Sequence, residues 1–189
     1  MRAAFVSILT VTIASAPAVA GPEFGLRGAY AVANESGTAI GDAFNYLVPL
    51  WVDAGWRVNP NLFLGAFVAY GIGLEKDRPR TSGRDIRFGI QAQVNTSLEK
   101  RVALWAGLGV GYEFLDVTSS GMTAYGWEFL HAQAGMDIST GTPIRVGPFA
   151  AFTVGEFMRE TFSGGPSFAL GDQLHVYGIF GLRAVLSFD

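Results

Sequence analysis

The segment from Asp85 to Asn95 places apolar and polar side chains at strictly alternating positions. All its even-numbered residues are apolar, and its odd-numbered residues are polar or glycine. Because successive side chains of a β-strand point to opposite faces, this segment predicts a strand with one apolar face and one polar face. The same alternation recurs in about eight segments, which predicts a chain built almost entirely from two-faced strands.

The connections between these segments alternate between short and long. We expect strands at residues 24–33, 46–58, 62–74, 85–95, 102–114, 125–138, 144–155 and 173–188. Short turns fall near residues 60, 98 and 141, and longer loops near residues 39, 79, 119 and 164. Eight strands joined in this way predict an all-β fold, an antiparallel up-and-down barrel with turns at one end and loops at the other.

The two faces of the predicted strands differ in a way that separates a membrane barrel from a soluble one. The even face is almost free of charge, whereas the odd face carries the charges together with glycines and large aromatic rings. A soluble barrel, such as a lipocalin, would instead place its charges on the solvated outer face. The sequence therefore predicts a transmembrane β-barrel whose even face meets about 25 Å of hydrocarbon and whose odd face fills the interior. The aromatic members of that interior face are Trp51, Phe63, Phe67, Trp105 and Phe149.

Outward-facing aromatic residues should form a girdle at each end of this barrel. We place the N-terminus and the short turns in the periplasm and the long loops outside. The girdle at the loop end would contain Tyr30, Tyr46, Tyr70, Tyr112 and Phe114. The girdle at the turn end would contain Phe24, Trp56 and Phe188.

Residues 1–20 have the features of a secretory signal peptide. Arg2 is followed by the apolar run Ala3–Ile13 and by a small-residue cleavage site that ends at Ala20. The mature barrel would then comprise residues 21–189, in which we find no apolar run long enough for a membrane-spanning helix. The chain has no cysteine, and its net charge of -3 with no basic stripe argues against nucleic acid as a partner.

The strand pattern resembles the small eight-stranded outer-membrane barrels, the family that includes the membrane domain of outer-membrane protein A. The resemblance covers residues 24–188, and the last strand matches the family's assembly signal at Leu186 and Phe188. It departs from the family in that Asp189 follows and Gly181 stands two residues before the usual glycine position. The resemblance implies an outer-membrane location, contact with outer-membrane lipid and lipopolysaccharide, and insertion by the barrel assembly machinery. We expect a monomer without cofactor or metal.

Charged residues on the inward face should pair with one another, because a charge buried without a partner is costly. We predict one arginine–carboxylate network in each half of the barrel, which together plug the lumen. The periplasmic half would contain Arg27, Asp53, Arg57, Asp137, Arg145 and Arg183. The outer half would contain Asp85, Arg87, Glu113, His131 and His175. The alternative for the same residues is a narrow ion path or gate.

The two histidines raise the possibility of an enzyme, since His131, His175 and Glu113 would suffice for an acid–base site. Some barrels of this size are lipid-modifying hydrolases that use an outward-facing histidine and serine. His131 is instead followed by Ala132 and Gln133, and both histidines fall on the inward face. We therefore predict a non-enzymatic envelope scaffold or surface-contact protein, with transport of small apolar molecules as the alternative and a hydrolase as the third hypothesis.

Two of the predicted loops have a composition that suggests a role. The basic residues of the loop near residue 79 could contact lipopolysaccharide phosphates or could simply be solvated; they are Lys76, Arg78, Arg80 and Arg84. The longest predicted loop, Glu156–Asp172, carries Phe157, Met158, Phe162 and Phe168. It could fold over the barrel mouth as a lid, or it could contact a partner or an apolar ligand.

Prolines and glycines within the predicted strands should shape the barrel wall. Pro49 and Pro148 each remove a backbone donor, so we expect a bulge or a local break at each. The inward-facing glycines should make room for the rings of Trp51, Phe67 or Trp105.

Overall fold

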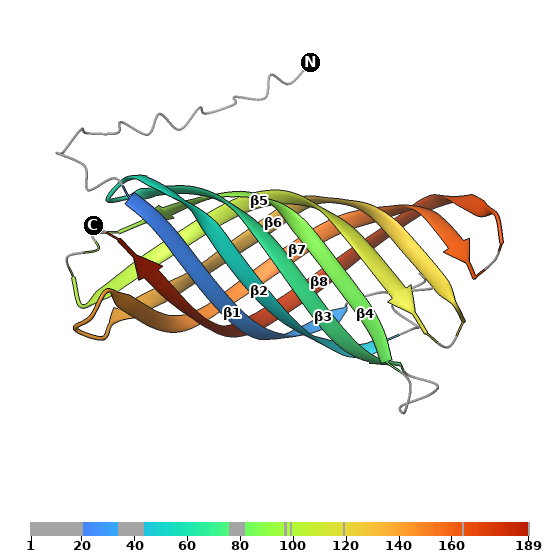
Figure 1. The fold of residues 1–189 in the computed structure, drawn as a ribbon, viewed down its shortest axis with the longest axis horizontal. Helices are drawn as coiled ribbons and strands as arrows, with labels where there is room; N and C mark the ends of the chain where they lie inside the picture. The colour runs from blue at the N-terminus through green and yellow to red at the C-terminus, as the bar shows by residue number, and fades with distance from the viewer. Residues whose placement is uncertain are drawn as a thin grey trace, which may run out of the picture.

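The computed structural model describes residues 21–33, 44–75, 82–96, 98, 100–118, 120–163 and 165–188. These residues form eight antiparallel strands, each paired with its neighbours in chain order, and β8 pairs with β1 to close the barrel (Figure 1). The predicted fold class is therefore confirmed. The strands are β1 (Gly21–Ala33), β2 (Phe44–Asn59), β3 (Leu62–Glu75), β4 (Ser82–Asn95), β5 (Val102–Val117), β6 (Met122–Ser139), β7 (Ile144–Phe162) and β8 (Ser167–Ser187).

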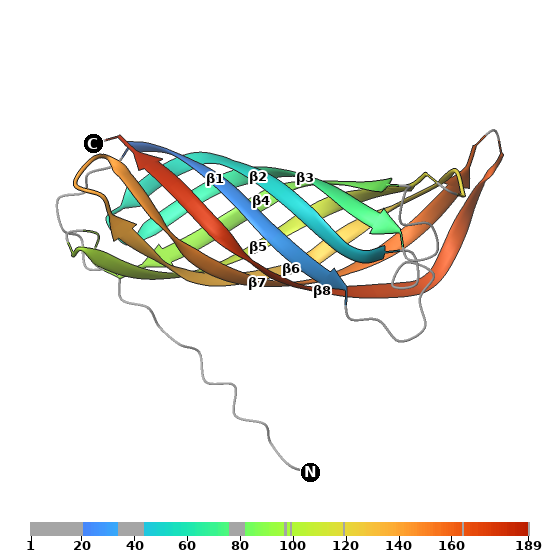
Figure 2. The same ribbon diagram turned by 90° about the horizontal axis from the view of Figure 1, so that it is seen from below.

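The barrel has two distinct ends. The turn end is the one at which β1 begins and β2, β4, β6 and β8 finish, and the loop end is the one at which β1, β3, β5 and β7 finish (Figures 1 and 2). Tight turns close the turn end: the Asn59 side chain accepts a hydrogen bond from the Asn61 amide (2.9 Å), and Gly141 adopts a φ of 81° that favours glycine. No helix among the described residues is long and apolar enough to cross a membrane. The predicted signal peptide, residues 1–20, lies outside the described residues.

Side chains alternate between the interior and the exterior as the sequence predicts. In β4, Asp85 and Arg87 are 0% and 1% exposed, whereas the alternate residues Ile86 and Phe88 are 41% and 45% exposed. The same parity holds along β1, β2, β3 and β5, along β7 as far as Phe157, and along β8 from Leu174 to its end. The outer surface is therefore formed mainly by aliphatic and aromatic residues. An apolar outer surface around a polar interior is the arrangement that hydrocarbon requires.

A bulge in β6 reverses this parity in the outer half of the strand. The pairing of β6 shifts between Glu128 and Leu130, opposite a shift between Gly109 and Gly111 of β5. Toward the loop end from this point, even-numbered residues of β6 are buried, namely Met122, Ala124, Gly126 and Glu128. The predicted alternation is therefore wrong for residues 125–129, because the extra residue of a bulge lets the following side chains change faces.

Two hairpins at the loop end are longer than predicted. The segment Glu156–Asp172 is not a long loop, because β7 continues to Phe162 and β8 starts at Ser167, with Thr161 paired to Ser167. Likewise, β5 and β6 pair up to Val117 and Met122. The β7–β8 hairpin extends beyond the ends of the other strands (Figure 2). Continued backbone pairing satisfies the N–H and C=O groups of these segments without a loop.

The two prolines break single ladders without a bulge. Among the described residues, Pro49 has no partner in the β1–β2 ladder and Pro148 has none in the β6–β7 ladder. The register of each ladder is the same on both sides of the gap. Each proline stays paired on its other edge, Pro49 with Gly71 and Pro148 with Leu182. The predicted local break is confirmed at both positions.

Aromatic rings gather at both ends of the outer surface. At the loop end Tyr30 stacks on Tyr46, with ring centroids 5.1 Å apart, and Tyr112 lies 5.2 Å from both Phe114 and Trp127. At the turn end Phe24 packs edge-on against Phe188 at 6.1 Å. Trp127 joins the loop-end girdle because the β6 bulge turns it outward.

Candidate functional site

The interior nearest the turn end is occupied by two arginines, each paired with one carboxylate. Arg57 donates to Glu23, with its Nε 2.8 Å from Oε2, and the Ser187 hydroxyl donates to the same oxygen at 2.9 Å. Arg183 donates to both oxygens of Asp137, at 2.8 and 2.7 Å. We call these the Arg57 pair and the Arg183 pair; in both, one cation is matched by one anion.

Side chains of the Arg183 pair also fill space between the strands. The Arg183 guanidinium lies 3.8 Å from the centroid of Trp105, and its Nη1 donates to Gln93 at 2.7 Å. The Trp105 ring fits because its neighbour Gly135 has no side chain: a Cβ there would lie 2.8 Å from Trp105 Cζ2. The glycine therefore makes the room that the sequence predicts for this ring.

The middle of the barrel is held by a third single pair, the Arg27 pair. Arg27 binds Asp53 through two nitrogens, with Nε 2.7 Å from Oδ2, and also donates to Gln91 at 3.0 Å. Gln133 accepts from Arg27 and in turn donates to Gln91 at 2.7 Å. The network is completed by rings on either side: Trp51 and Phe149 have centroids 5.7 and 5.6 Å from the Arg27 guanidinium.

The interior toward the loop end holds a different arrangement, which we call the Arg87 cluster. Its six members are Asp85, Arg87, Glu113, Glu128, His131 and His175. Arg87 faces three carboxylates, with Asp85 at 2.7 Å, Glu113 at 3.4 Å and Glu128 at 3.3 Å. A single permanent cation therefore serves three acidic groups.

Each histidine of the Arg87 cluster is bonded to one of these carboxylates. His131 Nδ1 lies 2.7 Å from Glu128 Oε1, and His175 Nε2 lies 2.8 Å from Glu113 Oε2. Aromatic rings enclose the cluster: Tyr177 lies 4.4 Å from the Arg87 guanidinium, and Phe157 lies 4.2 Å from the His175 ring. The two histidines, 0% and 1% exposed, thus face the lumen and not the lipid.

The structure places ten of the eleven predicted interior residues in these buried groups. The exception is Arg145, which is only partly buried and pairs with no carboxylate among the described residues. Its guanidinium donates to the backbone carbonyls of Leu98, Lys100 and Asp137, at 3.0, 3.0 and 3.1 Å, and so joins the β4–β5 turn to the end of β6. The charges also lie at three levels along the barrel, where the sequence predicts two networks.

Several polar residues on the predicted inward face are absent from the predicted networks. They stand at odd positions and are buried inside the barrel: Glu23, Gln91, Gln93, Asn95 and Gln133. Glu128 could not be found from this parity, because the β6 bulge turns an even-numbered residue inward. Among the described residues, no group of three His, Cys, Asp or Glu side chains is arranged to hold a metal ion.

The predicted lipopolysaccharide contacts are described only in part. Arg84 lies exposed on the outer face of β4, where it is the cross-strand neighbour of Asp116. Lys76, Arg78 and Arg80 lie outside the described residues.

No protein-family model matches the sequence, and a search of curated proteins finds no significant match. Solved structures do match the fold. Neisserial surface protein A (NspA) aligns with a TM-score of 0.59 at 17% identity, covering 89% of this chain and 99% of that one. Ail, the attachment invasion locus protein of Yersinia pestis, aligns with a TM-score of 0.53 at 13% identity, covering 89% and 99%.

The outer membrane protein AlkL, solved in DMPC lipid bilayers, aligns over 97% of both chains with a TM-score of 0.56 at 15% identity. These likenesses concern the backbone arrangement, since few residues are shared. Together with the closed barrel, its apolar outer surface and its two aromatic girdles, they identify the fold. The chain has the fold of the small eight-stranded outer-membrane barrels.

Proposed function

We propose that this chain is a non-enzymatic outer-membrane scaffold whose lumen is plugged by its own side chains and whose loop end makes surface contacts. The observation that carries the proposal is the occupied interior. Charged groups at three successive levels are bonded to one another, and rings of Trp51, Trp105 and Phe149 fill the space between them. An eight-stranded barrel has an interior just wide enough for such side chains.

Energetics favour a plug over a permanent pore. Each arginine of the single pairs is at most 6% exposed and makes two or more bonds to carboxylate or amide oxygens. Opening a path would separate these pairs, and breaking a buried pair costs about 3–5 kcal/mol. The interior is therefore suited to holding the barrel together, as a scaffold requires.

The same interior argues against the two other hypotheses. Uptake of small apolar molecules needs an apolar funnel from the loop end to mid-barrel, but the Arg87 cluster and the Arg27 pair occupy that part of the lumen. A lipid-modifying hydrolase needs a histidine that reaches lipid, but His131 and His175 point inward and bond to glutamates.

The loop end supplies the surface for contacts outside the cell. Two of the similar structures are named as a surface protein and as an attachment invasion locus protein. In this chain the β7–β8 hairpin projects beyond the barrel and exposes Met158, Phe162 and Phe168. Apolar side chains at the end of a projecting hairpin are suited to contact with another molecule, which is the alternative we prefer to a lid over the barrel mouth. Lipopolysaccharide contact at Arg84 and insertion by the assembly machinery belong to the same proposal.

Conductance in planar lipid bilayers tests the plug. We expect the wild-type barrel to give no steady, large single-channel steps. A double variant, Arg27→Ala with Asp53→Ala, removes the central pair and should raise the frequency of conducting events. Steady, large steps from the wild-type barrel would refute the plug.

A further inference from the structure

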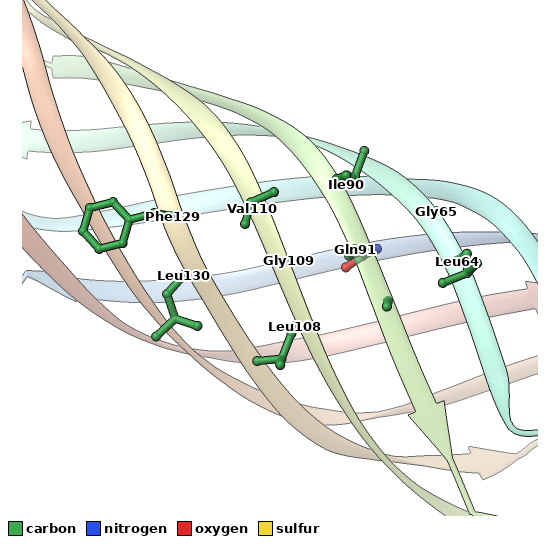
Figure 3. A pocket seen from close by; sticks show the side chains of 10 residues that line it. Leu64, Gly65, Ile90, Gln91, Leu108, Gly109, Val110, Phe129 and Leu130 are labelled. Carbon is green, nitrogen blue, oxygen red and sulfur yellow. The ribbon is translucent and has the colours of Figure 1, made fainter. Parts of the chain in front are cut away.

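Two shallow hollows lie next to each other on the outer face of the barrel. The first has a volume of about 680 Å³ and is lined by outward residues of β3, β4, β5 and β6, including Leu64, Leu108 and Phe129 (Figure 3). The second, of about 740 Å³, lies toward the loop end and reaches Trp127. Ile90 and Val110 line both hollows, so the two are continuous across this one pair of residues.

The hollows exist because small residues form their floors between large ones. Ala92 lines the first hollow and Ala66 the second, and the second is also lined by Gly89 and Gly111. The glycines are fixed by the interior: a Cβ on Gly89 would lie 2.8 Å from the Phe67 ring, and one on Gly111 would lie 3.2 Å from it. Side chains at these two positions would point into the barrel, so on the outer face both positions present backbone only.

The β6 bulge forms one wall of the first hollow. Phe129 is the extra residue of the bulge, and it projects outward with 49% of its surface exposed, next to Leu130. A strand without the bulge would turn Phe129 toward the interior, where odd-numbered residues of the lower β6 lie. The hollow therefore depends on a local irregularity and not on regular alternation.

The position of the hollows within the barrel wall indicates what fills them. No charged residue lines either hollow, and both interrupt the apolar surface that contacts the membrane. The occupant is then continuous with the bilayer interior, which consists of acyl chains.

The second hollow ends at Tyr112, Phe114 and Trp127 of the loop-end girdle. Beyond them the outward residues Arg84 and Asp116 are charged and mark the headgroup level. From Leu108 to Phe114 the strand rises about 20 Å, at about 3.4 Å per residue. Along a tilted strand this length is roughly the depth of one leaflet. An acyl chain of this reach would belong to a lipid of the leaflet at the loop end.

We propose that the outer face of β3–β6 binds one acyl chain of an outer-leaflet lipid, which lies along the two hollows across Ile90 and Val110. The site rests on the proposed orientation of the loop end toward the outside. It takes hydrocarbon as its ligand and selects by length and fit, because its walls are mainly apolar and carry no charged residue.

Native mass spectrometry of the barrel, extracted from outer membranes in mild detergent, tests this site. We expect the wild-type barrel to retain one lipid of the outer leaflet. Ala92→Phe fills the first hollow and Ala66→Phe fills the second, so each should lose the retained lipid. Ala150→Phe is the matched control, since Ala150 faces lipid on β7 away from the hollows, and this variant should keep it.

Three outcomes would overturn the proposal: a wild-type barrel that retains no lipid, equal lipid retention by Ala92→Phe and Ala150→Phe, or a retained lipid that comes from the other leaflet. Spin-labelled lipids in vesicles give a second measurement that does not require extraction: the wild-type barrel should immobilise one more lipid than Ala92→Phe does. Conductance is expected to be the same in all these variants. A conducting barrel that retains lipid would refute only the plug, and a non-conducting barrel without lipid would refute only the acyl-chain site. The two proposals therefore remain distinguishable.

Discussion

Arg183 and Arg87 are both buried inside the barrel, but their charges are balanced in different ways. Arg183 has one carboxylate, Asp137, bound through two short hydrogen bonds. Arg87 has three carboxylates, two of which also bond to histidines. The turn-end half is therefore a set of separate pairs, each dependent on both partners, whereas the loop-end half is a shared network. Removing a cation should therefore lower the free energy of unfolding most in the loop-end half. Removing an anion should lower it most among the separate pairs.

The largest effect is expected from replacing the shared cation. Arg87→Met would leave three buried carboxylates without their permanent positive partner, and we expect it to lower the free energy of unfolding by about 5 kcal/mol or more. Arg183→Met strands one carboxylate and should cost about 3 kcal/mol. Urea-induced unfolding in lipid vesicles, followed by tryptophan fluorescence, measures both. An equal loss in the two variants would show that the Arg87 cluster is not a shared network.

Removing a single anion should reverse the order. Asp53→Asn leaves Arg27 with amide partners only, and we expect a loss of about 3 kcal/mol in the same unfolding measurement. Glu128→Gln keeps Arg87 bound to Asp85 and Glu113, so about 1 kcal/mol or less should be lost. If Glu128→Gln proves as damaging as Asp53→Asn, the carboxylates of the cluster are not redundant.

A smaller loss of unfolding free energy should distinguish the tightness of packing near the Arg87 cluster from that in the middle of the barrel. A Cβ on Gly155 would lie 2.6 Å from His175 Nε2 and 2.8 Å from a backbone oxygen, so Gly155→Ala should cost about 2 kcal/mol by overpacking. A Cβ on Gly107 would meet the flexible Gln133 side chain at 3.1 Å and a backbone oxygen at 2.9 Å. Gly107→Ala should therefore cost about half as much, measured in the same way. A larger loss at Gly107 would mean that the middle of the barrel is the more tightly packed region.

Much of the fold was accessible from the sequence because a barrel wall imposes the same two-residue period on every strand. Asp85 to Asn95 alone predicts the sides of β4, and the prolines at 49 and 148 predict where ladders break. Strand ends at the loop end were not accessible. The β7–β8 hairpin beyond Glu156 mixes apolar and polar residues without regular alternation, and its register shifts between Phe157 and Arg159.

The interior was predictable only to the level of which residues face it. Parity placed Arg27 and Asp53 on one face, but it does not say which carboxylate an arginine will reach across the lumen. That choice depends on strand register and tilt, which set the heights of side chains on non-adjacent strands. Arg145 illustrates the point: it stands on the inward face, yet it lies low enough to bind turn carbonyls.

The bulge at Phe129 has a consequence for building hybrid barrels. The alternation in residues 122–128 of β6 is out of phase with the remainder of the strand. A segment grafted there from a regular barrel would present its apolar side chains to the Arg87 cluster and its polar ones to lipid. A chimera at this hairpin would need either to carry the extra residue along or to have its donor sequence offset by one position.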